Sequence, residues 1–190
     1  MDQLTRPLAL CAITLAFAGA ALAQSPAAPT QSPERMFISP AGEPFRPSPD
    51  GPPPFEVWWS HLDPTHSGRA DRAAFRADAV AFFERLDVNH DGVVDGFEVA
   101  AYEKSIAPEL AVDGQGMGSR GATRDGPVQL LADPEPVSGA DLDLTSKITL
   151  AEWLAATDRR FDMLDKKRQG FLDHDALLAM LPKAGRERRR

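Results

Sequence analysis

The chain has 190 residues, of which 43% are hydrophobic and 26% are charged, a composition typical of a soluble globular protein. Its net charge of −7 argues against a nucleic-acid partner and favours bound cations, which reduce electrostatic self-repulsion. Once the segments at either end are set aside, the length suffices for one compact domain or two small ones.

Residues 1–23 predict an export signal. Arg6 and the terminal amine provide a weak positive end, an uncharged apolar stretch follows, and Ala21 and Ala23 match the small-x-small pattern of a cleavage site. The alternative is an uncleaved membrane anchor, for which the stretch is short. The single cysteine, Cys11, lies inside this segment. A periplasmic or secreted protein without a thiol is therefore expected, with no membrane span after cleavage.

Three further segments lack the pattern of a folded element. Residues 24–54 are rich in proline and serine and predict an extended, mobile tether. Residues 107–128 predict a glycine-rich linker; they contain GMGSRG, but no strand pattern precedes it and no helical pattern follows it, so a dinucleotide site is not expected. Residues 183–190 form a basic tail, for which a solvated terminus is favoured over contact with an anionic surface.

The stretch DVNHDGVVDGFE, residues 87–98, spaces oxygen-bearing groups as a calcium ion requires. Calcium takes six to eight hard oxygen ligands, which a twelve-residue loop supplies from positions 1, 3, 5, 7, 9 and 12. Gly92 stands at position 6, where the chain turns with positive φ. The predicted ligands are Asp87, Asn89, Asp91, the carbonyl of Val93, Asp95 and Glu98.

A second loop with this spacing is DLDLTSKITLAE, residues 141–152. Its predicted ligands are Asp141, Asp143, Thr145, the carbonyl of Lys147 and Glu152, with Thr149 at position 9. Ser146 replaces the glycine at position 6, at a cost of about 1 kcal/mol of backbone strain. We therefore expect a weaker calcium site here.

Two more loops keep the spacing but lose ligands. Residues 63–74 have Ala74 in place of the final glutamate and neutral hydroxyls in place of acids, so a structural role is favoured. Residues 165–176 place Lys167 and Gln169 at ligand positions and are expected to pack without binding an ion.

The loop spacing predicts which loops pair. The first residues of the loops are 24 apart in each half, and the twelve-residue segments between loops contain neither glycine nor proline. Each segment therefore predicts one helix that holds its two loops about 18 Å apart. Paired loops must approach to about 5 Å. The pairing should thus join 87–98 to 141–152, and 63–74 to 165–176.

These motifs resemble the EF-hand, and the compact spacing is similar to that of exported bacterial EF-hand proteins of the lanmodulin type. The resemblance implies an all-α fold of helix-loop-helix repeats, with short β-pairing between loops and two halves, 55–106 and 129–182. Lanmodulin-type loops carry proline at position 2. Only Pro64 does so here, which argues against lanthanide selectivity.

The predicted function is calcium binding, with Ca²⁺ in a structural or buffering role. No catalytic constellation such as G-x-S-x-G occurs, so an enzyme is not expected. A zinc site is not expected either, because no two histidines stand three or four residues apart. The alternatives are a calcium-stabilised interaction module or sensor of the cell envelope, whose partner is unknown, and, less favoured, a lanthanide binder.

Overall fold

The structure is a computed structural model in which residues 35–108 and 127–182 are described. The predicted export signal, the basic tail and most of the predicted linker lie outside these ranges. All the described residues belong to one compact unit. Among them, no helix combines the length and the apolar character needed to cross a bilayer.

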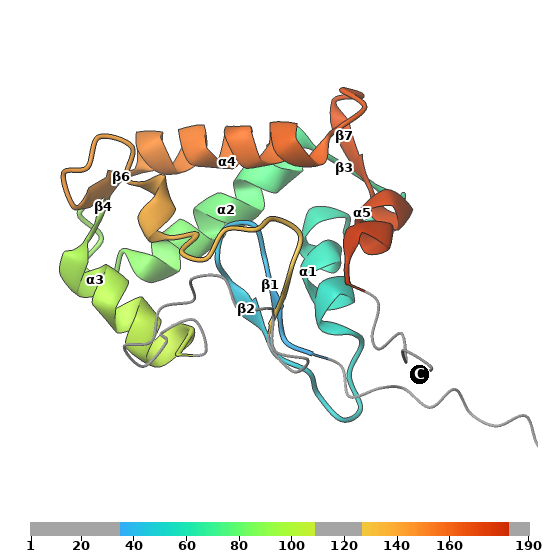
Figure 1. The fold of residues 1–190 in the computed structure, drawn as a ribbon, viewed down its shortest axis with the longest axis horizontal. Coiled ribbons are helices and arrows are strands. Elements are labelled where there is room, and N and C mark those ends of the chain that lie inside the picture. Colours follow the sequence, from blue (N-terminus) through green and yellow to red (C-terminus); the bar gives the residue numbers. More distant parts are fainter. Residues whose placement is uncertain (1–34, 109–126, 183–190) are drawn as a thin grey trace, which may run out of the picture. The chain divides into compact units, whose positions relative to one another are not determined.

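Helices α2 (Arg72–Leu86) and α4 (Leu150–Leu164) pack against each other (Figure 1). Each connects two of the predicted loops, so the prediction of one helix per pair of loops is confirmed. Trp153 of α4 is fully buried at this contact, with its ring 5.7 Å from that of Phe83. Its indole Nε1 donates to the Ala79 carbonyl of α2 at 2.8 Å, so the one polar atom of this side chain is satisfied.

Short antiparallel strands join the loops in pairs. Strand β4 (Val93–Asp95) pairs with β6 (Lys147–Thr149), and β3 (Arg69–Asp71) pairs with β7 (Phe171–Asp173). The central residue of each strand is buried. The second loop thus pairs with the third and the first with the fourth, which confirms the predicted pairing across the two halves.

Shorter helical elements complete the described part of the chain. Helix α1 (Pro54–Leu62) enters the first loop, and α5 (His174–Met180) leaves the fourth. Helix α3 (Gly96–Ala101) leaves the second loop and continues into a π-helical turn at Tyr102–Ile106. A 3₁₀ turn at Ser138–Ala140 precedes the third loop.

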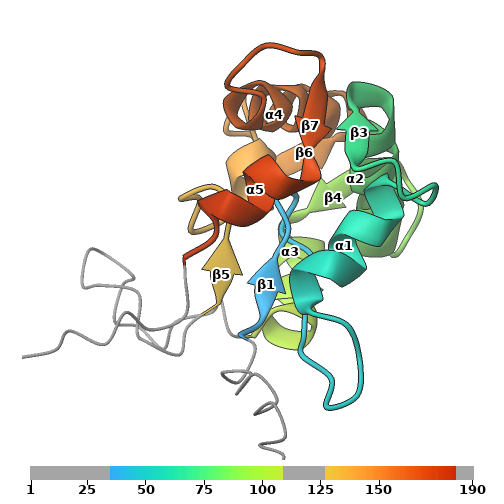
Figure 2. The same ribbon diagram turned by 90° about the vertical axis from the view of Figure 1, so that its right-hand side faces the viewer.

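A third sheet forms from residues of the predicted tether and from Val128 and Gln129, which lie at the boundary between the predicted linker and the predicted second half. Strand β1 (Phe37–Ile38) runs antiparallel to β2 (Pro44–Phe45) and parallel to β5 (Val128–Gln129), as Figure 2 shows for β1 and β5. Phe37 is only 2% exposed. The prediction that 24–54 is a mobile tether is therefore wrong for this hairpin, because averaging over a segment rich in proline and serine hid its few apolar residues.

The hairpin is fixed by contacts on two sides. The ring of Phe37 lies 5.2 Å from that of Trp58 in α1. On the other side, the Tyr102 hydroxyl donates to the Gly42 carbonyl at 2.6 Å. Gly42 has φ 103°, and a Cβ there would meet Pro136 at 2.9 Å, so the turn needs glycine for both its conformation and its close approach.

The predicted all-α class is wrong. The described residues are mixed α/β, with five α-helices and several small sheets, at 46% helix and 14% strand. Positions 7 to 9 of every loop are extended, because their backbone groups pair with another loop and their central side chains enter the core. The hairpin and β5 then add a sheet that the loops do not predict.

Substituting Phe37 with alanine tests whether the hairpin belongs to the core. We expect Phe37→Ala to lower the free energy of unfolding by about 3 kcal/mol, because it removes a buried aromatic ring and leaves a cavity. The matched control is Phe97→Ala, which removes a ring that is 87% exposed and should change stability by about 0.5 kcal/mol or less. Urea unfolding in chelator measures both; equal small effects would show that the hairpin is not part of the core.

His174 joins α5 to α1. Its Nε2 lies 3.0 Å from a carboxylate oxygen of Glu56, and its Nδ1 lies 2.9 Å from one of Asp175. Its ring lies 5.2 Å from that of Trp59. Burial lowers the pKa of His174, but the hydrogen bonds to Asp175 and Glu56 outweigh it, so the net shift is upward from 6.5. The protonated imidazole is therefore the form that stabilises this contact.

A raised pKa in the folded state makes the contribution of His174 depend on pH. The contribution is complete below pH 6.5 and is lost as the pH rises through the folded-state pKa. We therefore expect His174→Gln to destabilise the protein by up to about 1 kcal/mol at pH 5.5 and by less at pH 8.5. Urea unfolding at both values measures this, with His90→Gln, an exposed loop histidine, as the control. A pH-independent effect of His174→Gln contradicts the prediction.

Candidate metal centre

All four loops share one backbone arrangement at their first residue. In each, one carboxylate oxygen of the leading aspartate accepts the amide of the fifth residue, and the other oxygen accepts the amide of the sixth, at distances from 2.6 to 3.1 Å. The four aspartates are Asp63, Asp87, Asp141 and Asp165. The carboxylate at position 1 is thereby turned into the loop, where a calcium ligand is required.

The loops also share two left-handed residues. Position 4 has φ between 52° and 61° in every loop, and position 6 has φ between 61° and 83°. The residues at position 4 are His66, His90, Leu144 and Arg168; those at position 6 are Gly68, Gly92, Ser146 and Gly170. Ser146 is the one with a side chain at position 6, and its φ of 61° confirms the predicted strain.

In the loop 87–98, hydrogen bonds within the loop engage the carboxylates. Glu98 is 9% exposed, and its Oε1 accepts the Val88 amide at 2.9 Å and the Asn89 amide at 3.3 Å. Its Oε2 accepts the Asp95 amide at 3.0 Å. The final glutamate therefore reaches across the loop to its opening residues, which closes the loop on itself.

The remaining predicted ligands of this loop also contact one another. The Asn89 amide nitrogen donates to one carboxylate oxygen of Asp91 at 3.1 Å, and the Val93 amide donates to the other at 3.0 Å. All the side chains at ligand positions offer oxygen atoms, which suits a hard cation.

The loop 141–152 brings three carboxylates together. One oxygen from each of Asp141, Asp143 and Glu152 lies within 4.8 Å of the other two. Oε2 of Glu152 accepts both the amide and the hydroxyl of Thr149, at 2.9 and 2.7 Å. Its Oε1 is buried and has no hydrogen-bond partner among the described residues. An orphaned anionic oxygen beside two more carboxylates fits a bound cation.

The other two predicted ligands of this loop lie next to each other, since the Thr145 hydroxyl donates to the Lys147 carbonyl at 3.3 Å. Among the described residues, the group of three acids in 141–152 has no counterpart of equal closeness in 87–98. In the second loop both carboxylate oxygens of Glu98 accept backbone amides, whereas in the third loop Oε1 of Glu152 accepts no hydrogen bond from the described residues.

The loop 63–74 satisfies its acid internally. Burial by itself raises the pKa of Asp63, but hydrogen bonds from Ser67, Gly68 and Thr65 outweigh it and lower the pKa to about 2. The hydroxyls of Thr65 and Ser67 are what distinguish this carboxylate, because the two amide hydrogen bonds occur in all four loops. The fourth loop keeps Asp165 in the same arrangement, with Lys167 and Gln169 at ligand positions.

One cluster of ligand-type side chains has no signature in the sequence. Glu43, His61 and Asp78 each place one nitrogen or oxygen within 4.8 Å of the others. They come from the β1–β2 turn, α1 and α2, and no local spacing connects them. Glu43 also lies in the segment expected to be a tether, so only the packing of the hairpin reveals this group.

Comparison with models of known protein families finds no match, and comparison with curated protein sequences finds none. The resemblance of the loops to EF-hands therefore depends on their own residues.

Ser146 offers a test of the shared loop conformation. We expect Ser146→Gly to raise the free energy of unfolding by about 0.5–1 kcal/mol in calcium-free buffer, because glycine adopts positive φ without strain. The reciprocal change, Gly92→Ser, should lower it by about 1 kcal/mol. No other atom lies within 4 Å of a Cβ at Gly92, so backbone strain alone is tested. Urea unfolding measures both, and effects of the same sign would contradict the shared conformation.

Proposed function

We propose that the protein binds calcium through the loop 87–98 and, more weakly, through the loop 141–152. The spacing of oxygen-bearing side chains in both loops supports this, as does the loop conformation that all four repeats share. The ligands proposed for the first loop are Asp87, Asn89, Asp91, the Val93 carbonyl, Asp95 and Glu98. Those proposed for the second are Asp141, Asp143, Thr145, the Lys147 carbonyl and Glu152.

The observation that carries the proposal is the orphaned oxygen of Glu152. A buried carboxylate oxygen without a donor is costly, and two further carboxylates nearby add like-charge repulsion. A divalent cation relieves both costs at once. Protonation is the alternative, and it does not account for the calcium-like spacing of Asp141, Asp143 and Glu152 in the same loop.

Charge makes 87–98 the tighter site. It offers four carboxylates at ligand positions, from Asp87, Asp91, Asp95 and Glu98, whereas 141–152 offers three. Affinity of such loops rises with the number of charged ligands. For binding in 87–98, Glu98 exchanges its hydrogen bonds with backbone amides for contacts with the ion. Calcium then takes over from the hydrogen bonds that hold the loop closed.

The proposed role of calcium is to stabilise the structure. Strands β4 and β6 belong to the two calcium loops and pair with each other, so an ion in either loop holds the same ladder. For an exported protein, a site of about 10⁻⁴ to 10⁻³ M affinity remains substantially occupied at the calcium concentration outside cells. Mass action then adds about 1–3 kcal/mol of stability per site.

A second candidate role is a calcium-stabilised interaction module. Five of the seven large hydrophobic residues exposed in the described ranges lie in the two paired calcium loops. They are Val88, Phe97, Leu142, Leu144 and Leu150. Retention of a defined envelope protein in calcium, with release by chelator, would favour this role over buffering alone.

Calcium titration of the full chain by calorimetry tests the proposed function. We expect two binding events of unequal affinity. Glu98→Gln should remove the tighter one and Glu152→Gln the weaker one, because each deletes the bidentate ligand of its loop. Mg²⁺ and La³⁺ titrations in parallel measure selectivity among hard cations.

The matched control is Glu84→Gln, which removes an exposed carboxylate of α2 outside the loops and should leave both events unchanged. Absence of binding heat, together with a melting temperature that calcium does not raise, would overturn the proposed function.

A further inference from the structure

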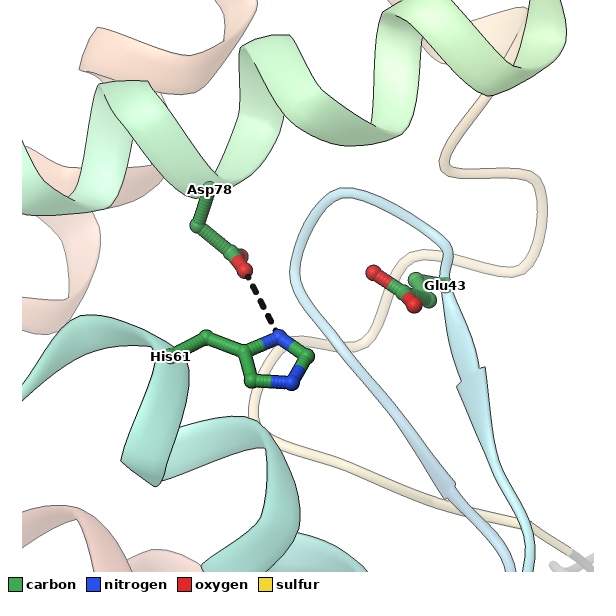
Figure 3. A group of neighbouring side chains, drawn as sticks. All are labelled: Glu43, His61 and Asp78. Carbon is green, nitrogen blue, oxygen red and sulfur yellow. Dashed lines mark ion pairs between the residues drawn. The ribbon is translucent and has the colours of Figure 1, made fainter. Parts of the chain in front are cut away.

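None of the three residues Glu43, His61 and Asp78, which Figure 3 shows together, belongs to the four loops. Glu43 stands at the end of the β1–β2 turn, His61 is in the last turn of α1, and Asp78 is in the middle of α2. The figure shows both carboxylates directed toward the imidazole. Three separate segments therefore present ligand-type atoms to one point.

Each carboxylate is held by a donor on one of its oxygens. Trp58 Nε1 donates to Oδ2 of Asp78 at 3.0 Å, and Arg85 Nη2 lies 2.6 Å from Oε2 of Glu43. In Asp78 the other oxygen, Oδ1, faces His61. Metal-binding carboxylates are commonly oriented in this way by hydrogen bonds from outside the coordination sphere.

The spacing between Asp78 and His61 is that of an ion pair, and it also fits two ligands of one metal ion. The distance from His61 Nδ1 to Asp78 Oδ1 is 3.4 Å. An N–H···O hydrogen bond has its donor and acceptor about 2.7–3.2 Å apart. Two ligands at about 2.0–2.1 Å from a tetrahedral zinc ion are about 3.4 Å apart.

Burial and charge also favour a cation at this point. The side chains of Glu43 and Asp78 are only 10% and 7% exposed, whereas that of His61 is 46% exposed and opens the group to solvent. Arg85 pairs with Glu43, whereas Asp78 contacts His61 and Trp58, so the group holds two carboxylates and one guanidinium. A divalent ion would balance the remaining negative charge.

The turn that carries Glu43 is built to hold a fixed position. The Ser39 hydroxyl accepts the Glu43 amide at 3.0 Å, and the Ser39 amide donates to the Glu43 carbonyl at 2.9 Å. The Tyr102 hydroxyl donates a hydrogen bond to the carbonyl of the neighbouring residue, Gly42. A ligand on such a turn loses little conformational freedom when it binds a metal.

We propose that Glu43, His61 and Asp78 bind a divalent transition metal, of which zinc is the representative, with water completing the coordination sphere. An imidazole nitrogen with two carboxylates suits zinc, cobalt or nickel, whereas calcium prefers a shell of oxygens alone. The site is thus chemically distinct from the calcium loops. A bound ion would fasten the β1–β2 hairpin to α1 and α2.

Zinc titration of the full chain in saturating calcium tests this proposal. We expect one equivalent of Zn²⁺ to bind and to raise the melting temperature, and His61→Asn to weaken binding at least tenfold. Co²⁺ used as a probe should give a visible absorption band that His61→Asn removes. The matched control is His90→Asn, which deletes an exposed loop histidine and should leave the zinc affinity unchanged.

Asp78→Asn is the second variant and keeps a side chain that can accept from Trp58. If His61→Asn destabilises the fold, its effect on zinc binding is ambiguous. The zinc affinity of Asp78→Asn then decides whether the group binds the metal. Unchanged zinc binding in both variants, or no binding at 1 mM Zn²⁺, overturns the proposal. Glu98→Gln should lose the tighter calcium-binding event yet retain zinc binding, so the failure of one site is distinguishable from the failure of the other.

Discussion

The structure depends on a constraint imposed by two rigid helices. Helices α2 and α4 each carry a loop at both ends, and a helix of that length separates its own loops too far for them to form a ladder. Each loop must therefore find its partner on the other helix. The antiparallel ladders β3–β7 and β4–β6 join the two helices at their ends. Trp153 and its neighbours fill the space between the helices. Loss of either ladder would leave two loops without the strands that pair them.

The β1–β2 hairpin has a different function in the architecture. It supplies Phe37 to the aromatic cluster of α1, and through Gly42 it contacts the helix that leaves the second loop. It thereby links α1 to the second loop by a route other than α2. The same hairpin carries Glu43 to His61 and Asp78, so one packing interaction creates both the third sheet and the proposed transition-metal site.

The two kinds of proposed site divide along the chemistry of their ligands. The loops offer carboxylate, amide and carbonyl oxygens from consecutive residues and adjust to a large, hard ion. The Glu43 group offers an imidazole and two carboxylates from three elements, which suits a smaller ion with firmer geometry. Loop 63–74 differs from both, because the hydroxyls of Thr65 and Ser67 donate to Asp63 in addition to the two backbone amides.

The sequence by itself determined the features that are local. Glycine at position 6, aspartate at position 1 and the uninterrupted helical segments predict the loop conformation, the strain at Ser146 and the pairing of loops, because each follows from a few neighbouring residues or from the length of a helix. Only the tertiary structure decided the rest. The burial of Phe37 showed that the predicted tether contains a folded hairpin, and the extra strands contradicted the predicted all-α class. Packing of the hairpin also brought Glu43 close to His61 and Asp78. These contacts join segments distant in the chain, and no spacing within a segment records which surfaces will pack together.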